Sequence, residues 1–218
     1  MSEILTRGIT GSVIVLLLIA MSYLSIYSAI AFWALISILA IVELIKNKMG
    51  GILSAIYLLV VCCSIILLGF FSYDTGSFSY NNPSLDTYNG LNLVVFMSVV
   101  WANDTFAYIG GRLLGKRVIK VGLAPNISPN KSWEGAVIGS LSAALIGYLF
   151  LGIVGAGIAF ITSTTATLSD LVESKAKRKV GIKDSGNLLP GHGGILDRFD
   201  ALLLSAPFTF IAVYILCQ

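Results

Sequence analysis

The stretch KDSGNLLPGHGGILDRFD, residues 183–200, gathers most of the side-chain types that enzymes use. It holds the chain's only histidine, three aspartates, a lysine and an arginine, and it runs directly into the apolar segment 201–217. Charged groups beside lipid are costly. The stretch is therefore either a solvated connector or a site that does chemistry. For His192, both a hydrogen bond that fixes the loop and a proton transfer remain open.

The preceding segment, SDLVESKAKRKVGI (169–182), would align acids and bases on one helix face. Side chains three or four residues apart share such a face, and here they are Asp170, Glu173, Ser174, Lys177 and Arg178. Asp197 and Asp200 share the next face in the same way. Carboxylates with waters and phosphates suit Mg²⁺, and lysine and arginine bind phosphate oxygens. Membrane topology or anionic lipid explains Lys175 and Lys179 but not the acids among them.

A second polar segment is WANDTFAYIGGRLLGKR, residues 101–117. Asp104 falls within an apolar span, where a carboxylate is a functional-site hypothesis by default. The alternative is an aspartate paired with a cation only to hold helices together. Glycines 110, 111 and 115 allow close approach either to a phosphate or to another helix.

A third polar segment is NISPNKSWEG, residues 126–135. Ser128 to Asn130 predict a turn, and Ser132 predicts the N-cap of a helix that opens at Trp133. Lys131 would then lie at the positive end of that helix, where an anion is favoured. An ordinary cap beside a lysine that reaches the membrane interface is the alternative.

The elements that must position these segments are membrane helices. The 218 residues are 56% hydrophobic and only 11% charged, whereas about a quarter of the residues of a soluble domain are charged. A helix of roughly 17–25 residues crosses a bilayer. Seven such spans are expected, at about 9–26, 28–45, 51–71, 91–110, 133–150, 152–170 and 200–217.

We therefore expect an all-α integral membrane protein, a polytopic helical bundle of about seven transmembrane helices. Ser25 to Ser28 would turn the first hairpin, and a tight junction near Gly152 leaves six crossings plus a re-entrant piece as an alternative. No cleaved signal peptide is expected. Residues 1–218 would form a single membrane domain, with scaffold spans in 1–90 and catalytic spans and loops in 91–218.

The basic residues predict the orientation of the bundle. With the N-terminus inside and seven crossings, all 14 lysines and arginines fall on one side, and the connection 72–90 on the other side has none. By the positive-inside rule that basic side is cytoplasmic. The three cysteines show no zinc or disulfide spacing and are predicted to be packing residues.

The ordered segments resemble those of the phosphatidate cytidylyltransferases, also called CDP-diacylglycerol synthases. The resemblance covers roughly the last 120 residues. The signature is present as Ser174, Lys177-Arg178, Lys183-Asp184, PGHGG at 190–194, and Asp197-Arg198-Phe199-Asp200. Two residues depart from the family pattern: Ser169 stands where glycine is usual, and Ala176 replaces a bulkier apolar residue. The N-terminal half is also shorter than in many members.

The resemblance implies that CTP and phosphatidic acid give CDP-diacylglycerol and pyrophosphate for phospholipid biosynthesis. It implies Mg²⁺ held by Asp170 and Asp197, with a second cation as a further option. Implied catalytic residues are Asp170, Asp197, Lys183, Asp184 and His192. Implied substrate-binding residues are Asp104, Ser128, Lys131, Ser174, Lys177, Arg178, Arg198 and Asp200. The expected partners are these substrates, membrane lipid and a second copy in a homodimer, without nucleic acid, in the inner (cytoplasmic) membrane with the active site facing the cytoplasm.

Two other functions are compatible with parts of this pattern. A related CTP-dependent enzyme acting on an isoprenoid-type lipid would keep a similar motif, and a substrate panel separates it. A cation transporter would carry ionisable residues near the bilayer midplane on several helices, whereas here all but Asp104 cluster towards one face. A CDP-alcohol phosphotransferase is disfavoured because no DG-x-x-AR type segment is present.

Overall fold

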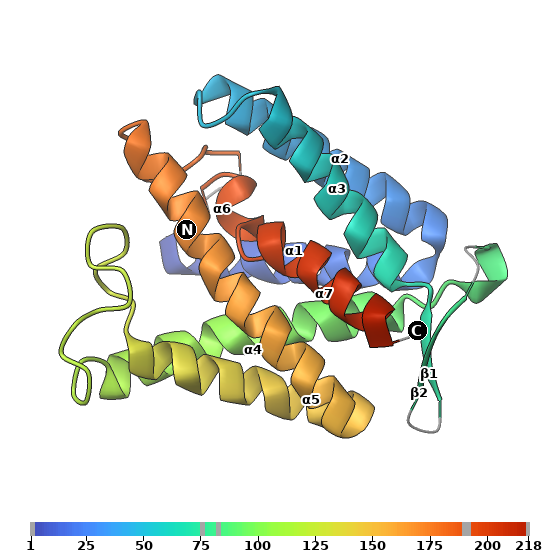
Figure 1. The fold of residues 1–218 in the computed structure, drawn as a ribbon. Helices are drawn as coiled ribbons and strands as arrows, with labels where there is room; N and C mark the ends of the chain where they lie inside the picture. The colour runs from blue at the N-terminus through green and yellow to red at the C-terminus, as the bar shows by residue number, and fades with distance from the viewer. Residues whose placement is uncertain (1–2, 75–76, 82–83, 189–192, 217–218) are drawn as a thin grey trace.

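Helices make up most of the described chain (Figure 1). The computed structural model describes residues 3–74, 77–81, 84–188 and 193–216. Its helices are α1 (Glu3–Leu24), α2 (Ile26–Lys46), α3 (Ile52–Leu68), α4 (Leu91–Leu114), α5 (Trp133–Lys179), α6 (Leu196–Phe199) and α7 (Leu202–Leu216). Strands β1 (Phe71–Asp74) and β2 (Ser77–Tyr80) form an antiparallel hairpin, followed by the short 3₁₀ helix η1 (Leu85–Thr87).

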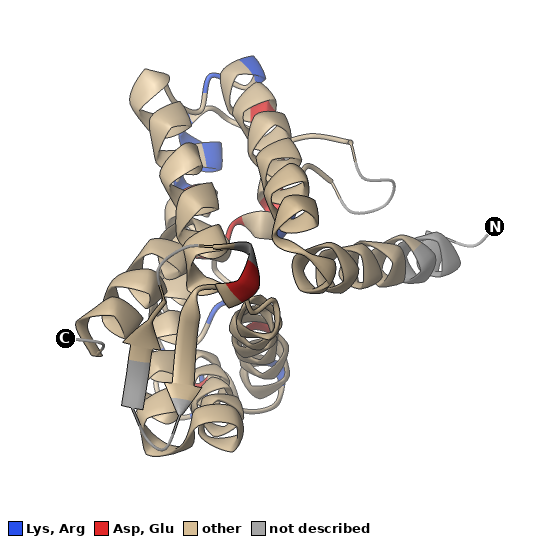
Figure 2. Cartoon of the chain, turned by 90° about the vertical axis from the view of Figure 1, so that its right-hand side faces the viewer, with Lys and Arg blue, Asp and Glu red and all other residues tan. Residues whose placement is uncertain are grey.

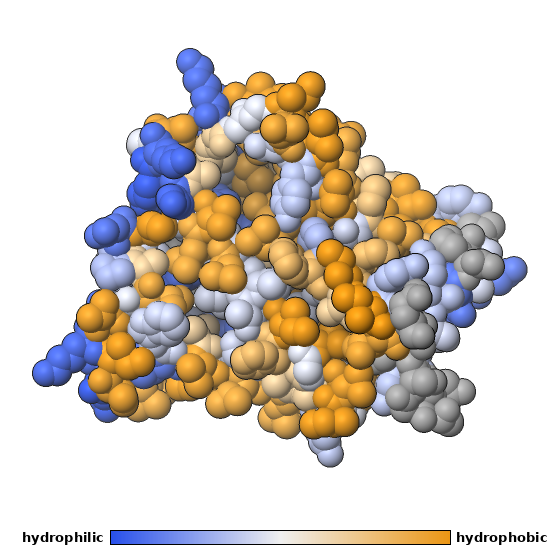
Figure 3. Space-filling model, in the orientation of Figure 1, coloured by the Kyte–Doolittle hydropathy of each residue, from blue (hydrophilic) through white to orange (hydrophobic). Residues whose placement is uncertain are grey.

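The expected all-α membrane architecture is confirmed. In the described part of the chain, four helical stretches are long and apolar enough to cross a membrane: α2, α4, α5 and Leu196–Leu216. Two shorter apolar helices, Thr10–Leu24 and Ile52–Leu68, accompany them. Apolar side chains cover most of the face in Figure 3, and hydrophilic ones gather at its left-hand end. The connections 47–51, 115–132 and 180–195 lie at that end (Figure 1), which we call the basic end.

The first helical hairpin turns where the serines predict it. Ser25 is the N-cap of α2, and its hydroxyl accepts a hydrogen bond from the Ser28 amide at 3.1 Å. The Ser28 hydroxyl accepts from the Ser25 amide at 3.1 Å and lies 2.8 Å from the Met21 carbonyl, to which it donates. This capping box satisfies amides that a helix start leaves without partners. A single residue therefore separates α1 from α2.

Helix α5 is two antiparallel arms, 133–150 and 153–179, joined by a sharp reversal (Figure 1). Leu151 and Gly152 leave helical geometry there, and Gly152 has φ 61°. That left-handed conformation favours glycine. The predicted junction near Gly152 is thus a reversal of the chain, and the long second arm runs on to Lys179 at the basic end.

The first arm of α5 lies almost in backbone contact with α4. A Cβ atom on Gly135 would come 2.6 Å from the Ala107 carbonyl oxygen, and one on Gly139 would come 2.6 Å from that of Asn103. Small residues let helices approach this closely in membranes. The sequence left open whether Gly110 allows close approach to a phosphate or to another helix. Gly110 packs against Ile138 of α5, so the close approach at this position is to another helix.

The N-terminal helices also contact the C-terminal segment. Trp33 of α2, which is 2% exposed, packs edge to face against Phe199 of α6 with ring centroids 5.8 Å apart. At the opposite end of the bundle, the Tyr88 hydroxyl donates to the Ser22 carbonyl at 2.6 Å, and burial raises the pKa of Tyr88 to about 12. Its proton, and therefore this hydrogen bond, stays in place across the physiological pH range. Helix α1 meanwhile projects sideways from the bundle (Figure 2).

The substitution Gly139→Ala should destabilise the protein by about 1–3 kcal/mol, the usual cost of overpacking, because the new methyl group collides with α4 backbone. Gly157→Ala on the same helix is the matched control, since a Cβ atom there meets nothing within 4 Å. Thermal unfolding of both variants in detergent measures the difference. Equal melting temperatures would contradict the close α4–α5 contact.

Candidate active site

Asn103 fixes the position of Asp104 relative to α5. The Asn103 side chain is 1% exposed, and its amide nitrogen donates to Asp104 Oδ1 and to Thr167 Oγ1, both at 3.2 Å. Thr167 lies on the second arm of α5. A buried amide that bonds two neighbours adopts few alternative positions. Asp104 is therefore held at the face of α4 that turns towards α5.

The segment before α5 brings a lysine to the second arm of the same helix. Ser132 is the N-cap of α5, as predicted, and its hydroxyl accepts from the Gly135 amide at 3.1 Å. The neighbouring Lys131 pairs with the carboxylate of Asp170, whose other oxygen accepts from the Ser174 hydroxyl at 3.3 Å. Lys131, Asp170 and Ser174 therefore form one connected group, although 39 residues separate the first two.

Three aspartates line one cavity at this place, which we call the acidic cavity. Its volume is about 610 Å³, and Asp104, Asp170 and Asp200 line it together with Lys131 and Arg112. The three acids come from α4, from the second arm of α5 and from the residue after α6. Since like charges this close repel, the cavity favours a cationic or metal-bearing ligand.

A second cavity of about 300 Å³ shares part of this wall. Asp104 and Asp200 line it as well, with Asp197 and Arg198, but its other lining residues are mostly apolar and include Ile14 and Leu18 of α1. The two cavities therefore meet at Asp104 and Asp200. Most residues that line the first cavity are polar, whereas the second combines its four charged side chains with apolar residues of α1 and α4.

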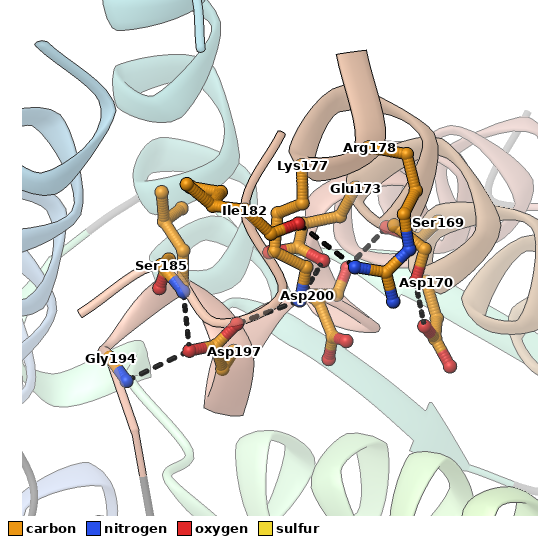
Figure 4. Close-up of polar contacts among 12 residues, drawn as sticks. Ser169, Asp170, Glu173, Lys177, Arg178, Ile182, Ser185, Gly194, Asp197 and Asp200 are labelled. Atoms are coloured by element: carbon orange, nitrogen blue, oxygen red, sulfur yellow. Dashed lines mark hydrogen bonds and ion pairs between the residues drawn. The ribbon is translucent and has the colours of Figure 1, made fainter. Parts of the chain in front are cut away.

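Lys177 is buried between two acids (Figure 4). Its ammonium lies 2.7 Å from Glu173 Oε2 and 2.7 Å from Asp197 Oδ1. The other oxygen of Asp197 accepts from the Ser185 and Gly194 amides, both at 2.8 Å. Buried ions are tolerated when they are paired, and among the described residues the Glu173 carboxylate has this ion pair alone, without a hydrogen bond to Oε1. This group joins the end of α5 to α6 and to the connection between them.

Ser169, where the family pattern usually has glycine, makes a contact that glycine lacks. Its hydroxyl is buried, donates to the Asp200 carbonyl and accepts from the Leu204 amide at 3.0 Å. The Leu204 amide lies in the first turn of α7, where backbone N–H groups have no acceptor within the helix. Ser169 therefore ties α5 to the junction of α6 and α7.

Of the remaining predicted site residues, Arg198 lines the second cavity, whereas the others lie outside both cavities or outside the described residues. The Arg178 guanidinium donates to the Ile182 carbonyl at 2.8 Å and is exposed, as are Lys183 and Asp184. Ser128 closes a turn with the Ala124 carbonyl at 2.8 Å. Arg198 reaches the second cavity. His192 lies outside the described residues, with positions 189–192.

Two glutamates that the sequence analysis did not assign to the site hold its loops. The Glu134 carboxylate accepts from three backbone amides, those of Lys116, Val118 and Ile119, at 2.8–3.1 Å. Glu43 of α2 is buried and bonds the 185–196 segment. Glu43 falls within the apolar run AIVELI. The argument applied to Asp104, that an acid in a span is a functional hypothesis, would have found it.

The acidic cavity fits a divalent cation that binds together with a phosphate ligand. Among residues 3–74, 77–81, 84–188 and 193–216, no three Asp, Glu, His or Cys side chains converge tightly enough to hold an ion alone. Mg²⁺ is commonly bound by one or two carboxylates, with waters and substrate phosphates completing its shell. Asp104, Asp170 and Asp200 supply such donors at this cavity. Both oxygens of Asp170 accept from Lys131 and Ser174, just as both oxygens of Asp197 accept from Lys177 and from backbone amides, so a cation would have to displace part of these bonds at either residue.

The fold and the site together define a class of membrane protein. An apolar helical bundle with acids and lysines gathered in cavities at one end is typical of a membrane protein that binds a polar ligand. The profile of the cytidylyltransferase family matches residues 6–216, and the chain belongs to that family.

Relatives from several bacteria are similar to the chain. A phosphatidate cytidylyltransferase of Brucella abortus is 35% identical over 205 residues, 85% of this chain and 73% of the relative. Those of Rickettsia bellii and Haemophilus influenzae are each 42% identical over 56% of this chain. These two alignments cover 57% and 46% of the relatives, so the chain spans about half their length.

The substitution Glu134→Gln should loosen the connection 115–132. An amide group has one acceptor oxygen, so its nitrogen would face a backbone N–H donor that now lacks a partner. Trypsin should then cut at Lys116, Arg117 or Lys120 about tenfold faster, because cleavage follows local opening. Cleavage at Lys46 and Lys48 serves as the internal control. Unchanged rates at 115–120 would contradict the loop-holding role of Glu134.

Proposed function

We propose that the chain transfers the cytidylyl group of CTP to phosphatidic acid, giving CDP-diacylglycerol and pyrophosphate. The observation that carries the proposal is that Asp104 and Asp200 line both the acidic, lysine-bearing cavity and a second cavity in which apolar side chains of α1 and α4 lie beside charged ones. The relatives named phosphatidate cytidylyltransferases support the same reaction.

The paired cavities suit two substrates of different character. A nucleoside triphosphate is polar throughout and would occupy the acidic cavity with its cation. A phosphatidic acid has a phosphate beside long acyl chains, so its head would reach the shared carboxylates while the chains lie against α1 and the surrounding lipid. Helix α1 projects from the bundle (Figure 2), and its Ile14 and Leu18 line the second cavity, so the lipid would approach from the membrane beside α1.

The reaction requires two anions to meet. A phosphate oxygen of phosphatidic acid attacks the α-phosphorus of CTP, a new P–O bond forms, and the bond to the bridging oxygen breaks to release pyrophosphate. The attacking phosphate is already ionised near pH 7, so no strong base is needed. A bound Mg²⁺ would neutralise and orient the phosphates.

The residues of the chain would divide this work. Asp170 would hold the cation, with Asp104 and Asp200 facing the same space, and Lys131 would contact a phosphate when the ligand displaces part of its ion pair. Exposed Arg178, Lys183 and Arg198 would meet the triphosphate. Asp197 and Lys177 would position α6. The earlier expectation that Asp197 binds the metal, and those for Ser128, Ser174, Asp184 and His192, stay predictions.

The membrane arrangement is part of the same proposal. Counting the two arms of α5 separately, α1 to α5 and α7 would make seven crossings, with the basic end facing the cytoplasm of an inner-membrane enzyme. CTP would arrive from that side, and phosphatidic acid from the inner leaflet. We also propose a homodimer without a nucleic-acid partner and leave a second cation as an option beside Mg²⁺.

Purified protein in mixed micelles should convert labelled CTP to CDP-diacylglycerol only when phosphatidic acid and Mg²⁺ are both present. The reason is that the proposed attack needs the lipid phosphate and a neutralised triphosphate together. An isoprenoid phosphate offered in the same micelles is the competing substrate. Product from the isoprenoid lipid alone would assign the nucleotide chemistry to that substrate class and overturn the phosphatidate proposal.

The substitution Asp170→Asn should lower kcat on the order of 100-fold and raise the Mg²⁺ concentration needed for half activity, because a neutral amide is a weak Mg²⁺ ligand. Asp86→Asn makes the same chemical change at an exposed acid near the opposite end and is the control. Steady-state turnover against Mg²⁺ concentration measures both. Activity at the wild-type level in Asp170→Asn would remove this residue from the metal site.

A further inference from the structure

Glu43 is buried in the apolar bundle, where an unpaired carboxylate would be strongly destabilising, but both of its oxygens accept hydrogen bonds. It is 7% exposed near the basic end of α2. One oxygen accepts from the Ile195 amide at 2.9 Å, and the other accepts from the Ser185 hydroxyl at 2.9 Å and the Leu196 amide at 3.0 Å. All three donors are neutral. A buried carboxylate without such donors would be strongly destabilising.

These donors belong to the two ends of one segment. Ser185 precedes the PGHGG stretch, and Ile195 and Leu196 follow it, so Glu43 joins the two ends from a helix more than 140 residues away. Asn47, one turn further along α2, donates to the Ser185 carbonyl. Positions 189–192 inside the segment lie outside the described residues.

Two glycines of this segment leave the space that Glu43 occupies. A Cβ atom on Gly186 would come 2.6 Å from Glu43 Oε1, and one on Gly194 would come 2.6 Å from Glu43 Oε2. The glycine positions and the glutamate are therefore fitted to one another. This contact gives a physical reason for a residue without a side chain on each flank of the loop.

Glu43 and Asp197 share the donors at the ends of the loop. Asp197 takes the Ser185 and Gly194 amides, while Glu43 takes the Ser185 hydroxyl and the next two amides, those of Ile195 and Leu196. Asp197 also pairs with Lys177 (Figure 4), and Asp200 lines the acidic cavity. A shift at Glu43 would thus move the short helix α6, which carries Asp197 and is followed directly by Asp200.

We propose that Glu43 is a positioning residue of the active site, which fixes the two ends of the connection, Ser185 and Ile195-Leu196, and through them the placement of Asp197 and Asp200. It acts through these aspartates and touches no substrate itself. The consequence for turnover rests on the reaction proposed above, but the consequence for the loop does not.

The test is Glu43→Gln, which keeps the shape and loses one acceptor. Amide hydrogen exchange at 185–196 should rise about tenfold, since a buried charge-assisted acceptor is lost. Turnover should show kcat reduced about tenfold with the KM for CTP changed less than about twofold, the pattern of a group that matters in the transition state. Glu134→Gln, the same change on another loop, should leave exchange at 185–196 unaltered.

Ser185→Ala removes one of the three donors and provides a milder second variant should Glu43→Gln fold poorly. It should raise exchange at 185–196 in the same direction, because it removes one of the three bonds that Glu43 accepts. Unchanged exchange in both variants would overturn the proposal. If the wild type makes no product from CTP and phosphatidic acid, the reaction is wrong, while hydrogen exchange still decides the role of Glu43.

Discussion

The cost of burying carboxylates in an apolar helical bundle governs this structure. Each acid away from water needs donors or a cation, and the chain meets that need in two ways. Glu43 and Asp197 accept hydrogen bonds from backbone amides and thereby hold loops, as Glu134 does at the surface. Asp104, Asp170 and Asp200 instead line a shared cavity at one end of the bundle. The same type of side chain thus serves as support in one set and faces a ligand space in the other.

Close helix packing makes the second set possible. Gly135 and Gly139 let the first arm of α5 lie against α4, and the reversal at Gly152 returns the second arm to the basic end. Lys131 can then reach Asp170, and Asn103 can reach Thr167. Gly135 and Gly139 therefore shape the site through helix contacts, while Gly111 also lines the acidic cavity.

The N-terminal helices participate in the site more directly than a scaffold would. Trp33 packs on Phe199, Glu43 closes the 185–196 loop, and α1 supplies the apolar side of the second cavity. The predicted division of the chain at residue 90 stays a prediction. The contacts of Trp33 and Glu43 show that α2, from the N-terminal part, packs against and holds the C-terminal segment that carries the motifs.

The sequence by itself determined the membrane class through its composition and the family resemblance through its ordered motifs. It also determined the serine turn before α2, the Ser132 cap and the long second arm of α5, because helix capping and helical periodicity depend on residues close together in the chain. It did not determine which acids would face one another. The spacing of Asp170, Glu173 and Lys177 placed them on one helix face, but only tertiary packing paired Lys177 with Asp197 and Lys131 with Asp170. The sequence marks Glu43 as an acid within an apolar run but does not identify its partners, which lie more than 140 residues along the chain and come within hydrogen-bonding distance only in the folded bundle.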